Sequence, residues 1–232
     1  MQTGLPTPTP PPEPECYTKK INKIQLVTIF QRFLKELDGR DKMMKTIQYL
    51  LKILMHYKWA QAKHWSTITS QFSMTRKVLR LGNAIGPLKE FSKKNTVREN
   101  LFLLNETIND LCDDLFCLYK LGWVNKKLGE RAEVISAYCW FIGIMKDLND
   151  NRKSLRKQQK SLAKKDEAIM LDRLEMEKKV FVTEISIVKL FMDGVFCACD
   201  IWPPSNSASV QAWSGFFSGL LAAYKLWIKF ST

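Results

Sequence analysis

Carboxylates are the side chains of this sequence whose spacing comes nearest to a catalytic pattern. Four of them fall within a short segment of the chain: Glu106, Asp110, Asp113 and Asp114. Paired carboxylates can hydrolyse a glycoside or bind a cation, but a solvated or internally paired helix face shows the same clustering. Asp38 and Asp41 have simpler roles at the ends of helices. We therefore expect no catalytic carboxylate pair.

Histidines and cysteines give equally little support for a catalytic or metal site. His56 and His64 are too far apart along the chain to form a recognised ligand pair, and Cys197-Ala-Cys199 lacks both zinc-knuckle spacing and a partner pair. No signal peptide precedes the six cysteines, so we expect reduced thiols that pack as small core residues. Nucleotide-binding, hydrolase and metalloprotease motifs are absent from the sequence. It predicts no enzyme, no metal and no cofactor.

An apolar stripe flanked by cations is the most informative pattern, and it lies between residues 72 and 91. Its apolar members follow one another at intervals of four, three, four and three residues: Met74, Val78, Leu81, Ile85 and Leu88. At about 100° per residue they share one face of a helix, while Arg76, Lys77 and Arg80 project from another side. Such a helix can lie on an anionic bilayer, with all eight residues as membrane-binding candidates. It can equally pack on its own domain.

Proline and glycine limit that helix. Pro87 removes a backbone donor and clashes with the preceding turn, so we expect an end or a kink between Gly82 and Pro87. The segment 74–85 is therefore the best-defined part of the membrane-binding helix.

The net charge of +13 is unevenly distributed. Residues 17–95 carry 17 Lys and Arg against 4 Asp and Glu, whereas residues 96–150 carry 6 against 9. A basic N-terminal region indicates an anionic partner, and a phospholipid membrane fits better than nucleic acid because zinc-finger, ribonucleoprotein and Gly-rich basic signatures are absent. The acidic side of a predicted helix at 96–121 could face the basic N-terminal helices.

Apolar periodicity predicts an all-α fold, a membrane-associated helical bundle. We expect helices at 18–37, 41–60, 64–87, 96–121, 134–145, 167–201 and 207–230. Asp38-Gly39 should break the first two, with Asp41 capping or beginning the second and pairing with Lys45. The uncharged segment 134–145 is about 18 Å long, too short for a bilayer core, and so predicts a buried helix or part of a tilted span.

The chain divides into three regions by composition. Residues 1–16 form a Pro-rich leader, residues 17–95 a basic amphipathic-helix region, and residues 96–232 a membrane-associated region with a basic hairpin at 146–180. Within that hairpin, residues 152–165 hold seven cations and no carboxylate. This run fits either a solvated hairpin tip or a basic targeting or lipid-facing loop.

A transmembrane helix is expected at 207–229. Residues 205–224 contain no charge, and a helix from 208 to 228 would be about 31 Å long, enough to cross a bilayer. Gly215 and Gly219 form a G-x-x-x-G motif for a close helix contact. A buried C-terminal helix of a bundle is the alternative.

Three blocks together resemble the peroxin-11 family of peroxisomal membrane proteins. Residues 33–51 contain D-G-R-D-K followed by Q-Y, and residues 76–83 read R-K-V-L-R-L-G-N. The third block is a pair of C-terminal helices, 190–202 with its C-D-I-W ending and the Gly-rich apolar 213–227. The resemblance covers most of residues 25–230, and the order and spacing of the blocks make it specific.

The resemblance implies a function at the peroxisome. In that family the helix matching residues 72–91 inserts into the outer leaflet and tubulates the membrane before fission. Members self-associate and work with a dynamin-related fission GTPase and its tail-anchored adaptor. Some are linked to metabolite permeability and fatty-acid oxidation, which makes a metabolite channel the alternative. Members differ in whether they span the membrane, so the resemblance leaves the topology open.

Overall fold

The computed structural model describes residues 23–59, 62–91, 95–164 and 170–231, and these residues form helices without any strand. The predicted all-α fold is confirmed. The Pro-rich leader and residues 18–22 of the first expected helix lie outside the described residues. The helices are α1 (Lys23–Lys35), α2 (Leu37–His56), α3 (Ala62–Val78), α4 (Ile85–Glu90), α5 (Val97–Lys120), α6 (Lys126–Lys164), α7 (Met170–Ile201) and α8 (Ser207–Ser231).

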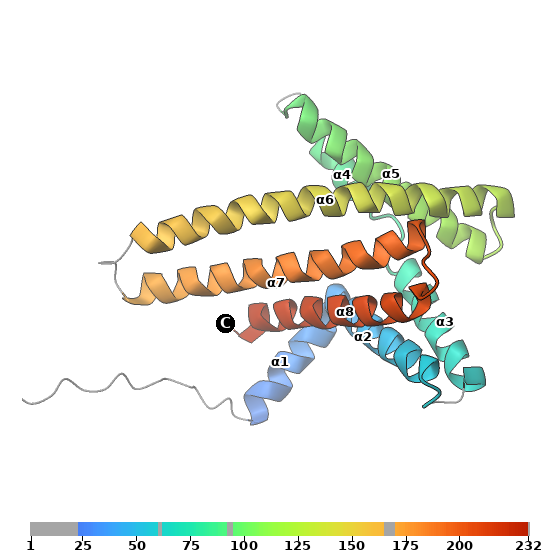
Figure 1. Ribbon diagram of the computed structural model, residues 1–232, viewed down its shortest axis with the longest axis horizontal. Coiled ribbons are helices and arrows are strands. Elements are labelled where there is room, and N and C mark those ends of the chain that lie inside the picture. The colour runs from blue at the N-terminus through green and yellow to red at the C-terminus, as the bar shows by residue number, and fades with distance from the viewer. Residues whose placement is uncertain (1–22, 60–61, 92–94, 165–169, 232) are drawn as a thin grey trace, which may run out of the picture.

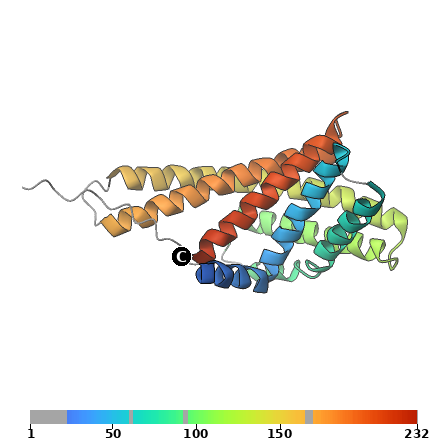
Figure 2. The same cartoon turned by 90° about the horizontal axis from the view of Figure 1, so that it is seen from below.

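Six of the helices pack as a ring. α5 contacts α6, α6 contacts α7, α7 contacts α8, α8 contacts α2, α2 contacts α3, and a smaller contact between α3 and α5 closes the circuit. α1 lies across α2 and α8, and α4 packs on α5. α6 and α7 continue past the ring as a two-helix arm, which projects to the left in Figure 1 and again in Figure 2. We define the arm as residues 151–164 of α6 and 170–183 of α7.

Local sequence signals set several helix ends. α5 begins at a capping box, in which the Thr96 hydroxyl accepts from the Glu99 amide and the Glu99 carboxylate accepts from the Thr96 amide at 2.7 Å. α7 ends at Ile201, directly before Trp202-Pro203-Pro204, as the prolines predicted. α8 occupies the predicted C-terminal segment.

The first helix break differs from the expected one. α1 ends at Lys35 and α2 begins at Leu37, so Gly39 lies inside the first turn of α2. A Cβ on Gly39 would collide with the carbonyl oxygen of Phe33. The close approach of this backbone, and not a turn, therefore requires a glycine at position 39. Asp41 neither caps nor begins the helix, and Lys45 pairs with Asp193 of α7 at 2.9 Å instead of with Asp41.

The apolar faces of α5 and α6 point outward. Residues 134–145 belong to the 39-residue helix α6, and the expectation that they are buried holds for one face only, where Ile144 is 3% exposed. Their exposed apolar side chains lie on the outer face: Val134, Ile135, Tyr138, Ile142 and Met145. α5 behaves alike, because Leu104, Ile108 and Leu111 of its apolar stripe are exposed. The ring therefore shows apolar side chains to its surroundings.

The expected transmembrane helix at 207–229 is not supported. None of the described helices combines the length and apolar composition that a membrane crossing requires. α8 carries small and polar residues on its buried face, including Ser214 and Ser218, and these lower its hydropathy. The G-x-x-x-G contact is confirmed, since a Cβ on Gly215 would meet the Tyr49 ring and one on Gly219 would meet Thr46 of α2.

The interior of the ring holds a buried charge network. Asp193 is 3% exposed, and its carboxylate accepts hydrogen bonds from Lys45, Lys189 and Ser218. Burial alone would raise the pKa of Asp193, but the two ammonium groups outweigh it and lower that pKa to about 2. Charged side chains thus lie inside the ring beside buried apolar residues such as Leu51 and Phe116, while other apolar residues of α5 and α6 lie outside.

Candidate functional site

The apolar stripe of the predicted membrane helix is largely exposed. Its outward members include Val78, Leu81, Ile85 and Leu88, with exposed fractions between 41% and 58%. Met74 is half-buried. Four of the five apolar side chains therefore remain available at the surface, together with the neighbouring Phe91.

The stripe does not lie on one continuous helix: a break near Gly82 was expected, but it begins already after Val78, so the predicted continuous helix over 74–85 is wrong. α3 ends at Val78, residues 79–84 form turns, and α4 begins at Ile85. Gly82 adopts a positive φ of 85°, and its amide donates to the Asp114 carboxylate at 3.0 Å. Pro87 is the third residue of α4, where its missing N–H costs no intrahelical hydrogen bond. The apolar residues thus occupy a corner, which we call the α3–α4 corner (residues 74–91).

The three predicted membrane-binding cations turn toward the interior or into ion pairs. Arg76 is 9% exposed; its Nε donates to Asp41 at 2.9 Å and its Nη1 donates to Gln48 at 2.9 Å. Burial alone would raise the pKa of Asp41, but Arg76 and Lys42 lower it below its ordinary value. Arg76 therefore holds α3 onto α2 and is not presented to a surface.

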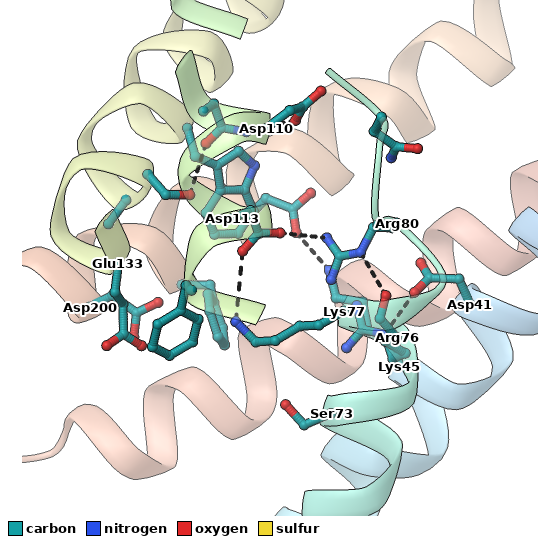
Figure 3. Close-up of a pocket in the computed structure, with 18 of the residues that line it drawn as sticks. Asp41, Lys45, Ser73, Arg76, Lys77, Arg80, Asp110, Asp113, Glu133 and Asp200 are labelled. Atoms are coloured by element: carbon teal, nitrogen blue, oxygen red, sulfur yellow. Dashed lines mark hydrogen bonds and ion pairs between the residues drawn. The ribbon is translucent and has the colours of Figure 1, made fainter. Parts of the chain in front are cut away.

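Lys77 and Arg80 both face Asp113 of α5 (Figure 3). The Lys77 ammonium lies 3.7 Å from one carboxylate oxygen and over the Phe116 ring, 3.9 Å from its centroid. Arg80 is 4.0 Å from the other oxygen, with 43% of its side chain exposed. Burial lowers the pKa of Lys77, and Asp113 counteracts part of that shift. The expectation that the acidic side of this helix faces the basic N-terminal helices is confirmed.

A polar cavity of about 800 Å³ lies inside the ring and is lined by residues of all six ring helices. Figure 3 shows cations of α2 and α3 on one side, and carboxylates of α5 to α7 on the other. The labelled acidic residues on that other side are Asp110, Asp113, Glu133 and Asp200. Burial raises the pKa values of Asp110 and Asp200. The cavity can solvate polar solutes of either sign.

Sequence reasoning missed the partners that orient the cations. Asp41 and Gln48 were not identified as partners of Arg76, because residues 35 and 28 positions away leave no local pattern. Asp113 could be found, since the opposite charges of the two regions indicated the pairing. Within the described parts of the chain, no group of three or more His, Cys, Asp or Glu is arranged to hold a metal ion.

These features define a class of protein: an all-helical molecule with charged side chains inside and amphipathic helices whose apolar faces remain uncovered. The family profile described as Peroxisomal biogenesis factor 11 (PEX11) matches residues 27–227. The chain belongs to this family. It is accordingly a peroxisomal membrane protein that acts in peroxisome proliferation.

Relatives from plants and an amoeba match over nearly their full lengths. Peroxisomal membrane protein 11C of Arabidopsis thaliana is 26% identical over 213 residues, covering 84% of this chain and 89% of its own. Peroxisomal membrane protein 11-4 of Oryza sativa subsp. indica is 28% identical over 218 residues, covering 85% and 93%. The Peroxisomal membrane protein 11 homolog of Dictyostelium discoideum is 23% identical over 261 residues, covering 90% and 98%. No solved structure is detectably similar.

Proposed function

We propose that this protein elongates and tubulates the peroxisome membrane by inserting the α3–α4 corner into one leaflet, and that it thereby promotes peroxisome fission. The exposure of Val78, Leu81, Ile85 and Leu88 is the observation that supports this most strongly. Four apolar side chains on two short segments form a compact wedge, which needs no long continuous helix.

Energetics favour reversible insertion of the corner. Fully burying a Val, Leu or Ile side chain is worth about 1.5–3 kcal/mol. Since the four outward residues are about half exposed already, moving them into lipid would contribute roughly half of that each, or about 3–6 kcal/mol together. Volume added to one leaflet favours positive curvature, the direction needed for a tubule.

Ion pairs fix the direction in which the wedge points. Arg76 anchors α3 to α2 through Asp41, and Asp113 with Asp114 anchors the corner to α5. Because these pairs use the cations internally, the wedge acts through its apolar residues. The α3 cations then serve as positioning residues for the wedge.

The test is tubulation of anionic liposomes by the full chain. Replacing Val78→Glu together with Leu81→Glu should abolish tubules, because a carboxylate at each position opposes insertion. Leu26→Glu with Val27→Glu on α1 is the matched control, since both residues are exposed and the same substitutions are made. Tubulation by the α3–α4 variant at the level of the native chain would refute the wedge.

A membrane channel for metabolites linked to fatty-acid oxidation is the second candidate. The polar cavity of about 800 Å³, surrounded by six helices of which α5 and α6 turn apolar residues outward, favours it. A channel would give conductance in planar bilayers that survives Val78→Glu with Leu81→Glu. The wedge proposal predicts loss of tubulation in the same variant, so the two functions are separable.

Partners of the proposed function are anionic lipids, further copies of this chain, and the dynamin-related fission GTPase with its tail-anchored adaptor. The exposed apolar stripes of α5 and α8 support self-association, because stripes of this length are normally covered. Chemical cross-linking in isolated peroxisomes should yield homo-oligomers. If only monomers are found at a saturating concentration of cross-linker, the proposed self-association is refuted.

A further inference from the structure

The arm carries the largest group of outward-facing cations on one helix face. Five basic residues of α6 are exposed there: Arg152, Lys153, Arg156, Lys157 and Lys160. They span nine positions, or about 12 Å along the helix. No carboxylate occurs between residues 151 and 164. The arm thus presents a dense line of positive charge.

The opposite side of the same helix forms the seam with α7. Half-buried residues recur there at intervals of three and four: Leu148, Asn151, Leu155, Gln158 and Leu162. The Gln158 side chain accepts a hydrogen bond from the Thr183 hydroxyl of α7 at 3.0 Å. At about 100° per residue, the five cations are centred opposite this seam. Packing against α7 therefore turns them away from the molecule.

The exposed acidic residues of the arm, Asp172, Glu175 and Glu177 of α7, form no described ion pair with these cations. Across the described part of the chain, no ion pair within 4.0 Å joins any of the five to a carboxylate. The exposed acidic residue Glu177 of α7 pairs with Arg173 of its own helix instead. The cations of the α3–α4 corner, in contrast, face Asp41 and Asp113.

We propose that the basic face of the α6 arm binds the anionic headgroups of the membrane surface. A row of cations on a rigid helix matches a plane of phosphates, and each cation within a Debye length of that plane adds to the attraction. The family places the chain at the peroxisomal membrane, so a phospholipid surface is its natural neighbour. The arm then supplies the electrostatic attachment that the paired α3 cations do not supply.

Vesicle flotation of the full chain tests the proposal. Vesicles of phosphatidylcholine with phosphatidylserine serve as the anionic probe, and phosphatidylcholine alone as the neutral one. The arm variant changes all five residues to Gln. The control variant changes five other exposed cations to Gln, with the same loss of net charge: Arg32, Lys35, Lys63, Lys127 and Arg131.

The arm variant should lose at least about tenfold in affinity for anionic vesicles, while the control should lose no more than about threefold. Both should bind neutral vesicles as the native chain does, and helical circular dichroism verifies folding. Added salt should lower the affinity for anionic vesicles more in the native chain and the control variant than in the arm variant. Equal losses in the two variants would show that only net charge matters. Native affinity in the arm variant would assign the surface to another partner, such as an acidic protein segment, and either result overturns the proposal.

Discussion

The cations of the α3–α4 corner and those of the α6 arm have similar sequences and opposite surroundings. Arg76 is 10% exposed at its side chain and hydrogen-bonded to Asp41, and Lys77 lies against Asp113. Arg156 and Lys157 of the arm are exposed, and no described carboxylate lies within ion-pairing distance of them. The corner presents apolar residues and hides charge, whereas the arm presents charge. Basic residues in a sequence therefore mark a charged surface only where the neighbouring helix does not turn its carboxylates toward them, as α7 does not in the arm.

The difference arises from what each helix packs against. α3 contacts α2 and α5, and both helices bring carboxylates to the interface. The arm segment of α6 contacts α7 through a seam of Leu, Asn and Gln. We infer a division of labour, in which the arm attracts the membrane and the corner deforms it.

The largest expected effect is the loss of the Arg76 contacts. Arg76→Met should lower the free energy of unfolding by about 3–5 kcal/mol, because it leaves the buried carboxylate of Asp41 without its closest cation. Denaturant titration measures the change. Lys153→Met on the arm is the matched control and should change stability by less than about 0.5 kcal/mol. Similar losses of unfolding free energy in both variants would show that the cations of the two regions do not differ in their structural role.

Acid should break the inward ion pairs before it affects the arm. The pKa of Asp193 is held at about 2, below the ordinary value of 3.8, so its stabilising contribution is present above pH 3.8 and is lost as the pH falls through 2. The expected loss is about 2 kcal/mol. The lowered pKa of Asp41 acts in the same direction. Denaturant titrations at a series of acidic pH values should show this loss in the native chain and a smaller one in Asp193→Asn.

Removing Asp113 should leave the cations of the α3–α4 corner without a facing carboxylate, as in the arm. Asp113→Asn deletes the carboxylate that faces Lys77 and Arg80, and we expect a stability loss of about 1 kcal/mol or less because these pairs are partly exposed. The freed cations should raise affinity for anionic vesicles by about fivefold. Asp110→Asn, on the same helix but without a described ion pair, is the control. An unchanged affinity in Asp113→Asn would mean that the corner does not approach the headgroups.

The smallest effect concerns a single arm residue. Lys153→Gln should leave the free energy of unfolding within about 0.5 kcal/mol of the native value. Its affinity for anionic vesicles should fall by no more than about fivefold, since one cation near the surface contributes about 1 kcal/mol. Flotation at low salt measures the change. A stability loss above about 1 kcal/mol would show that Lys153 has an internal role.

Several helix ends were predictable from local signals, and burial was not. Trp202-Pro203-Pro204 ended α7 and Gly215 with Gly219 made the close contact with α2, because prolines and glycines act on their immediate neighbours. Periodicity also placed the helix that became α5. It could not tell which faces are covered, since this depends on helices that are distant in sequence. Hence the uncharged segment of α6 was expected to be buried, whereas only one of its faces is.

The candidate site was predicted in its apolar residues and missed in its charges. Val78 to Leu88 were predicted as a membrane-binding face, with packing on the domain as the alternative; they are exposed, and the break around Gly82 places them on a corner. The partner of Arg76 lies 35 residues away and that of Lys45 lies 148 residues away. A sequence shows such pairs only as regional charge balance. The opposite charges of the two regions predicted that α5 faces α3. They did not predict the individual contacts of Asp41 or Asp193.

The central claim is that attachment and deformation of the membrane reside in different regions. The most direct test counts tubules on anionic liposomes at equal amounts of bound protein, for the arm variant and for Val78→Glu with Leu81→Glu. We predict that the arm variant, added at a higher concentration to match its binding, forms tubules as the native chain does. The corner variant should bind and form none. Tubules from the corner variant, or their loss in the arm variant at matched binding, would contradict the account.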